Sequence, residues 1–204
     1  MRRTILAGLA AAAASILLLS GCASSTDGLA EAYGEVAEQD YFSSDGAFSF
    51  IAPANRGNPI TFEGMTDMSA PWSSSDYLGD PVVVNFWYAG CPPCRLEAKD
   101  LAGLHKQFSG DGVAFIGVNI LDSPETAITF AREFGISYPS LMDVESGMVR
   151  LAFAGEASPN AVPTTLVLDR DHRVAARVNG LITDVALLET MINDVLAETP
   201  EPTA

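Results

Sequence analysis

Residues 81–94 read PVVVNFWYAGCPPC, a strand followed by a short loop and a pair of cysteines. The continuous apolar, β-branched run at 82–87 is typical of a central strand that is covered on both faces. Cys91 and Cys94 then stand at the start of a helix predicted over residues 91–108. Because the pair lies where a buried strand gives way to a helix, this stretch decides both the fold and the candidate chemistry.

The position of the two cysteines favours redox chemistry. A helix N-terminus has unpaired N–H groups and a positive dipole end, which lower the pKa of a thiol such as that of Cys91. Cys94 lies one turn further along, where it can attack a mixed disulfide formed at Cys91. A purely structural disulfide that closes so short a loop would remove little unfolded-state entropy. The predicted working centre is therefore a redox-active disulfide, Cys91–Cys94, with no separate cofactor.

The flanking sequence alternates between strand and helix patterns, which predicts a mixed α/β domain. Ser123, Pro124 and Gly135 carry start and stop signals for one helix. Thr183 is predicted to cap the last helix, which has an apolar stripe. Further strands are expected at 113–120, 138–142, 164–168 and 173–178, a helix at 145–153, and an opening hairpin between 47–50 and 60–62.

The N-terminus has the pattern of an export signal. Arg2 and Arg3 precede an apolar run over residues 5–19, and at about 15 residues this run is shorter than the roughly 20 needed to span a bilayer. It ends in Leu-Ser-Gly-Cys at residues 19–22, which resembles a bacterial lipobox. Residues 1–21 are therefore predicted to be a lipoprotein signal peptide, with Cys22 acylated as the new N-terminus. An ordinary cleaved signal, with Cys22 uninvolved, is the alternative.

The remaining segments divide by composition. Residues 22–44 are predicted to be a flexible tether with a short helix at 29–38, residues 45–197 the folded domain, and residues 198–204 a polar, proline-rich disordered tail. This arrangement predicts a domain anchored by lipid at the extracytoplasmic face of a bacterial cell membrane. The formal net charge of −15 argues against nucleic acid as a partner.

Residues 84–97, VNFWYAGCPPCRLE, resemble the active-site segment of the TlpA/ResA/DsbE family of membrane-tethered, thioredoxin-like proteins. The similarity continues through 117–119, 138–143 and 162–169, and it covers residues 45–197. It implies a thioredoxin-like α/β fold, with a central mixed sheet flanked by helices, an inserted helix and strand, and an N-terminal hairpin. Gly90 departs from the tryptophan that usually precedes the first cysteine, a difference that bears on the contact surface.

The resemblance also implies a substrate-binding edge beside the cysteines. In the family, a cis proline faces the pair, and Pro163 matches it; the backbone of Val162 would then be open to pair with a substrate strand. A trans proline that merely starts a strand is the alternative. Trp87 and Tyr88 are expected to form the core and wall of the site, and a substrate contact is left open for Tyr88.

Glu97 is the predicted proton-handling group. Asn85 occupies the position at which plain thioredoxins carry a buried aspartate, and an amide cannot shuttle protons. The family instead has a glutamate three residues after the second cysteine, and Glu97 matches it. The spacing supports this role, because Cys94, Glu97 and Leu101 share one helical face. Burial would raise the pKa of Glu97 and suit it to exchange a proton with Cys94. A glutamate at the rim of that face, reaching solvent, is the alternative.

Other chemistries for the pair fit less well. A zinc site needs about four ligands, and His105 and His172 lack ligand-like spacing, so no metal is expected. A copper-delivery site would usually space its cysteines three residues apart, and a peroxidatic cysteine would have threonine where Tyr88 stands. The stretch 122–142 resembles an insertion typical of the family, and it would either shape a pocket or add a packing layer.

The predicted function is therefore an extracytoplasmic thiol-disulfide oxidoreductase that exchanges disulfides with exported proteins. The resemblance implies a reductant that keeps apocytochrome c thiols ready for haem attachment and is fed by a membrane electron-transfer protein. Two alternatives stay open. One is an oxidant that forms disulfides in secreted proteins. The other is a non-catalytic binding module on a thioredoxin scaffold, with a static disulfide.

Overall fold

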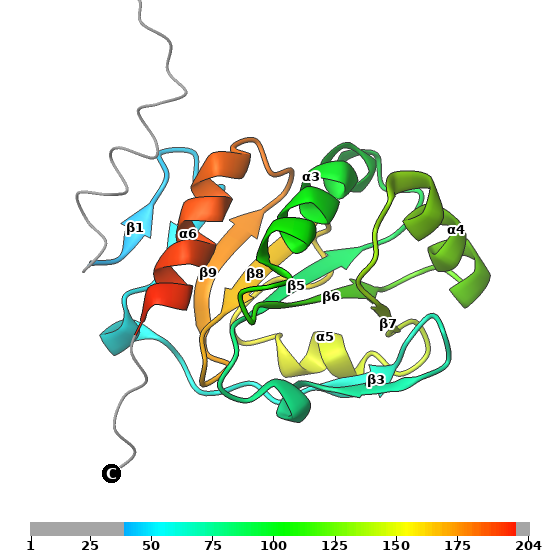
Figure 1. Ribbon diagram of the computed structural model, residues 1–204, viewed down its shortest axis with the longest axis horizontal. Coiled ribbons are helices and arrows are strands. Elements are labelled where there is room, and N and C mark those ends of the chain that lie inside the picture. The colour runs from blue at the N-terminus through cyan, green and yellow to red at the C-terminus, as the bar shows by residue number, and fades with distance from the viewer. Residues whose placement is uncertain (1–38, 199–204) are drawn as a thin grey trace, which may run out of the picture.

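The computed structural model describes residues 39–198, which fold around a seven-stranded sheet (Figure 1). The strands are β1 (Tyr41–Phe42), β2 (Phe48–Phe50), β3 (Glu63–Met65), β4 (Pro71–Ser73), β5 (Val82–Trp87), β6 (Ala114–Asn119), β7 (Ser140–Met142), β8 (Thr164–Leu168) and β9 (Val174–Asn179). The helices are α3 (Pro92–Phe108), α4 (Pro124–Phe134), α5 (Met148–Ala152) and α6 (Val185–Ala197), with short 3-10 turns at Pro53–Asn55 and Ser74–Tyr77.

The sheet is mixed, and most of its pairs are antiparallel. Its strand order is β1-β2-β9-β8-β5-β6-β7, and only the β5–β6 and β6–β7 pairs are parallel. β3 and β4 form a separate antiparallel hairpin, joined to β7 by a bridge between Thr66 and Leu141. This arrangement confirms the predicted thioredoxin-like class, with a central mixed sheet flanked by helices.

Both faces of the sheet are covered. Successive side chains of a strand point to opposite faces, so the side chains of the central strands pack into two separate clusters. In β5, Val83 packs into the cluster formed with α3 and α6, whereas Val84 and Phe86 pack into the opposite cluster. That opposite cluster includes residues of α5, the β4 strand and the segment before β3. Figure 1 shows α3 and α6 on one side of the sheet and α5 with β3 on the other. The continuous apolar run at 82–87 thus reflects burial on two sides.

The predicted helices form largely where their end signals place them. Cys91 caps α3, and the Ser123 side chain accepts a hydrogen bond at the first turn of α4, which ends at Gly135 in a left-handed conformation. The predicted cap of α6 is wrong by one residue: Asp184, not Thr183, accepts the hydrogen bond from the Leu187 amide. A carboxylate and a hydroxyl are both good caps, so the sequence does not separate these neighbours.

The predicted pairing of the N-terminal hairpin is wrong. The strand at 48–50 pairs with β1 and β9 rather than with residues 60–62, and residues 63–65 pair with β4. The β1–β2 pair is itself an N-terminal hairpin, with Tyr41 buried. Short strands carry little pairing information, and their partners are decided by which sheet edge and apolar surface lie nearby.

Both domain ends also differ from the prediction. Because β1 packs onto the sheet, the ordered domain begins before residue 45, within the predicted tether. Glu198, assigned to the tail, forms an ion pair with the buried Arg56. The signal segment, Cys22 and the predicted helix at 29–38 lie outside the described residues. Across residues 39–198, no helix is long and apolar enough to cross a membrane.

Candidate functional site

The two cysteines lie at the start of α3, as predicted, and form a disulfide with an S–S distance of 2.09 Å. Cys91 is the N-cap residue, and its Sγ accepts a hydrogen bond from the Cys94 amide at 3.2 Å. The amide of Cys91 in turn donates to the Tyr88 carbonyl. Sγ of Cys91 therefore occupies the position where the first-turn N–H groups and the helix dipole favour a thiolate.

The disulfide packs against two buried aromatic side chains, Trp87 and Phe130. Both cysteines pack with Trp87, Ala98 and Phe130 in one buried cluster. The indole of Trp87 packs against Phe130 with ring centroids 4.4 Å apart and ring planes tilted by 35°, and it donates a hydrogen bond to Ser140 Oγ. Trp87 is 4% exposed and packs beside the cysteines, and a substrate contact at this residue stays a prediction.

The remaining predicted contact residues lie beside the same cluster. Val162 and Tyr88 are half-buried and pack against the group that holds both cysteines. The Val162–Pro163 peptide bond is cis, and Pro163 is buried at the start of β8. The fold thus brings Val162, which is 71 residues from Cys91 in the sequence, to the cluster that contains the redox pair.

Glu97 lies on the buried face of α3, one turn after Cys94, with 1% of its surface exposed. Its Oε1 accepts a hydrogen bond from Asn85 Nδ2 at 3.0 Å, and its Oε2 accepts one from the Ile182 amide at 3.1 Å. Burial raises the pKa of Glu97 to about 7, although both hydrogen bonds oppose the shift. Glu97 can therefore release or take up a proton near neutral pH.

Three groups that hold the site in place were not identified from the sequence as parts of it. Asn85 and the amide of Ile182 hold Glu97, and Asn85 also donates to Thr165 Oγ1 at 3.0 Å. Asp122 holds the loop before Cys91, because its Oδ2 accepts from the Ala89 amide at 2.6 Å. A polar residue in the loop at the carboxyl end of a buried parallel strand is a recognisable signal for such a group, and Asp122 is the third residue after β6.

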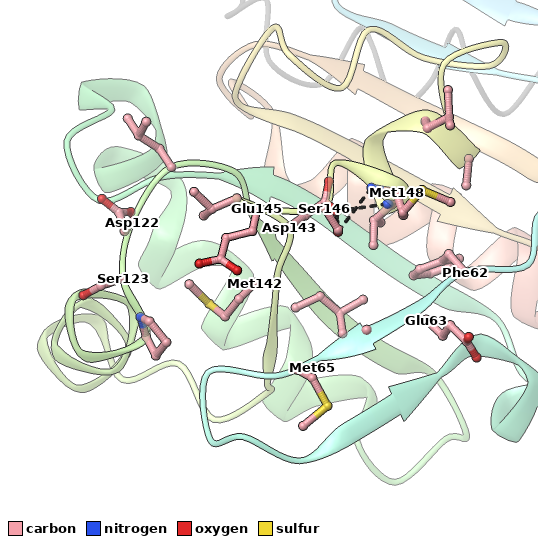
Figure 2. Close-up of a pocket in the computed structure, with 18 of the residues that line it drawn as sticks. Phe62, Glu63, Met65, Asp122, Ser123, Met142, Asp143, Glu145, Ser146 and Met148 are labelled. Carbon is pink, nitrogen blue, oxygen red and sulfur yellow. Dashed lines mark hydrogen bonds between the residues drawn. The ribbon is translucent and has the colours of Figure 1, made fainter.

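A groove of about 1010 Å³ opens beside this loop, and Figure 2 shows its lining residues as sticks. Its wall is formed by β3, by residues 121–124, and by the segment from Leu141 to Ala152. The insertion at 122–142 therefore has both of its expected roles. Its two ends line the groove, whereas Ala127 and Phe130 of α4 pack under the cysteines. Within residues 39–198, no three His, Cys, Asp or Glu side chains form a metal-binding cluster.

The fold and the cysteine pair define a class of protein, the thioredoxin-like thiol-disulfide oxidoreductases. Residues 57–177 match the AhpC/TSA family, and the chain belongs to this family.

Among its relatives, the chain is 30% identical over 122 residues to the thiol-disulfide oxidoreductase ResA of Bacillus subtilis, with 60% of this chain and 63% of that protein aligned. It is 33% identical over 151 residues to the thiol:disulfide interchange protein HelX of Rhodobacter capsulatus, with 74% of this chain and 77% of HelX aligned. These relatives match the TlpA/ResA/DsbE group indicated by the motif.

Two solved structures of thiol-disulfide proteins have a similar fold. A secreted thiol-disulfide isomerase from Corynebacterium glutamicum superposes with a TM-score of 0.66 at 28% identity, covering 77% of this chain and 96% of that one. A DsbF homologue from Corynebacterium diphtheriae gives a TM-score of 0.64 at 31% identity, covering 76% and 97%.

Proposed function

We propose that the chain exchanges disulfides with exported proteins through Cys91 and Cys94, and that it acts as a reductant in cytochrome c maturation. The observation that carries the exchange chemistry is the disulfide at the first turn of α3, with the buried Glu97 one turn behind it. The resemblance to the TlpA/ResA/DsbE family supports the choice of substrate. The resemblance of residues 19–22 to a lipobox supports a location at the extracytoplasmic face of the membrane.

In the reducing direction, the Cys91 thiolate attacks one sulfur of the substrate disulfide. A new S–S bond joins Cys91 to that sulfur, and the other substrate sulfur leaves as a thiolate and is protonated. Cys94 then gives its proton to the Glu97 carboxylate and attacks Sγ of Cys91. This second step forms the Cys91–Cys94 bond and releases the remaining substrate thiolate. Two electrons have passed to the substrate, and a dithiol of the membrane electron donor restores the pair.

The oxidising direction is the second candidate. The same steps in reverse would transfer the Cys91–Cys94 disulfide to two thiols of a secreted protein. The similarity to a secreted thiol-disulfide isomerase supports this alternative. Direction depends on the relative stability of the dithiol and disulfide forms, and about 30 mV already corresponds to 1.4 kcal/mol.

Equilibration against glutathione and dithiothreitol buffers tests the direction. A potential near that of thioredoxin, about −270 mV, is the expected result for a reductant. A potential near that of DsbA, about −120 mV, would replace the reductant with the oxidant.

The exchange chemistry has its own test. Cys91→Ser should abolish exchange, and Cys94→Ser should accumulate the mixed disulfide at Cys91, detectable by intact mass. Unchanged exchange in Cys91→Ser would leave only a static disulfide on a binding module.

A further inference from the structure

The groove beside the active-site loop gathers exposed apolar side chains. Nine large apolar residues are exposed within residues 39–198, and five of them line this groove. The five are Met65, Leu121, Val144, Met148 and Leu151. Solvent-exposed apolar residues are unremarkable when scattered, but a contiguous group around a concavity is typical of an interaction site. At about 1010 Å³, the groove is at the upper end of the range for ligand sites, roughly 300–1,000 Å³.

The same groove is acidic. Its lining includes four carboxylates and no lysine, arginine or histidine. Asp143 is neutralised by Arg150 and by amides at the start of α5. Over the described part of the chain, no cationic side chain lies within salt-bridge distance of the other three, Glu63, Asp122 and Glu145. Figure 2 shows all three at the groove. Their charges are therefore available to a cationic partner.

Two contacts connect the groove to the redox pair. Asp122 lines the groove and accepts a hydrogen bond from the amide of Ala89, two residues before Cys91. Met142 also lines the groove, and it packs against the buried cluster that contains both cysteines. A chain segment lying in the groove would therefore lie next to the residues that hold the loop before Cys91, although neither cysteine lines the groove itself.

We propose that this groove receives the polypeptide segment next to the substrate cysteine, and that it selects segments carrying apolar side chains and at least one lysine or arginine. This inference rests on the proposed disulfide exchange and names its substrate class. Apolar side chains of the segment would cover Met148 and Leu151, and its cation would lie near Glu145. Apolar burial supplies affinity, and the uncompensated carboxylates supply selectivity and a faster encounter.

Exchange kinetics with three substrates test the groove. Two are synthetic peptides of equal length, each carrying one cysteine as a mixed disulfide with thionitrobenzoate. One flanks the cysteine with leucine and lysine, and the other has glutamate in place of lysine. Bis(2-hydroxyethyl) disulfide is the small neutral reference. Each variant is reduced beforehand and freed of reductant, and its second-order rate constant with each peptide is divided by its rate constant with the reference.

The lysine peptide should be preferred by the wild-type protein, and the preference should weaken as salt rises. Glu145→Lys should lower the ratio for the lysine peptide about tenfold and raise that for the glutamate peptide. Leu151→Ser should lower the ratio for both peptides. Matched controls are Asp111→Lys and Leu78→Ser, both exposed and outside the groove; Leu78 is 67% exposed and Leu151 65%. These controls should leave both ratios unchanged.

Equal ratios for the two peptides in the wild-type protein, or ratios unaltered by Glu145→Lys and Leu151→Ser, would overturn the proposal. A concentration-dependent dimer in sedimentation that Leu151→Ser dissociates would also overturn it, because a second copy would then occupy the groove. The exchange function is tested separately. If Cys91→Ser still reduces the small reference disulfide, the proposed function fails, whatever the peptide ratios.

Discussion

At the scale of single residues, Glu97 shows how the fold alters the chemistry of a side chain. In water, a glutamate carboxyl is ionised well below neutral pH, but here burial raises its pKa to about 7. Asn85 and the Ile182 amide donate to its two oxygens and fix its orientation. Each carboxylate oxygen thus has one donor, and the orientation of the side chain is fixed by groups from two other parts of the fold.

This pKa shift predicts how stability depends on pH. The folded-state pKa is higher than the value of 4.5 expected in the unfolded chain, so between these values the folded state binds more protons than the unfolded state. The contribution of Glu97 is therefore most favourable below pH 4.5 and is lost as pH rises to about 7, by about 3 kcal/mol in all.

Urea unfolding of the oxidised protein at a series of pH values should show this slope, and Glu97→Gln should remove it. The glutamine amide would face one of the two donors, so the variant starts less stable, and the readout is the difference in slope. Parallel pH curves for the two proteins would contradict the raised pKa.

The position of Glu97 on the helix and its burial were predictable, whereas the groups that donate hydrogen bonds to it were not. A spacing of three and four residues places Cys94, Glu97 and Leu101 on one face whatever the helix packs against. The hydrogen bond from Ile182 comes from a residue 85 positions further along the chain, and only the closed fold brings it to Glu97. The residues against which Trp87 and Tyr88 pack were likewise not predictable from their own neighbours in the sequence. Both pack in a cluster that also contains residues of α4 and Val162.

At the scale of elements, the loop between β5 and α3 is held by Asp122. One carboxylate oxygen accepts hydrogen bonds from the Ala89 amide at 2.6 Å and from Asn119 Nδ2 at 2.8 Å. Asn119 ends β6, so the carboxyl end of one parallel strand is tied to the loop that follows its neighbour. The position of Cys91 is thereby linked to the adjacent strand as well as to its own helix.

Removing the Asp122 carboxylate should destabilise the loop between β5 and α3. Asp122→Ala leaves the Ala89 amide and the Asn119 side chain without their acceptor, at a cost of about 1–3 kcal/mol. Asp122→Asn should recover most of this, because one amide oxygen can accept from both donors. Chemical denaturation of the oxidised proteins measures the difference. Equal losses in the two variants would mean that the charge of Asp122, not the hydrogen bonds, stabilises the loop.

Helix ends were easier to predict than strand partners. Ser123, Pro124 and Gly135 act on the backbone within a few residues, so their pattern marks α4 from the sequence alone. Strands of two or three residues lack such signals, and the strand at 48–50 pairs with β9, which lies more than 120 residues away.

At the scale of the whole molecule, Arg56 joins three distant parts of the chain. Its buried guanidinium contacts Asp169 at 3.0 Å, in the turn between β8 and β9, and Glu198 at 2.6 Å, just after α6. Asp169 also pairs with Arg173 at 2.8 Å. This network closes the end of the domain at which the N-terminal segment and the C-terminal helix meet.

Arg56→Ala should cost about 3 kcal/mol of unfolding free energy, because it leaves Asp169 buried with only Arg173 to compensate it. Glu198→Ala should cost about 1 kcal/mol, since that carboxylate is one-quarter exposed. Thermal or urea unfolding compares the two variants with the wild-type protein. A Glu198→Ala loss as large as that of Arg56→Ala would assign the main stabilisation to the chain terminus.

Local sequence patterns were sufficient to predict the mixed α/β class, the strand–loop–helix unit around Cys91 and Cys94, and the position of Glu97 on the face of α3 behind them. These features depend on residue patterns within one or two helical turns or a single strand, where local backbone geometry links sequence to structure. The partners of the short strands, the hydrogen-bond donors to Glu97, the contact of Asp122 with the Ala89 amide and the acidic groove became visible only in the tertiary structure. Each of these arises where segments far apart in the chain exclude water together, and no local pattern encodes which segments will meet.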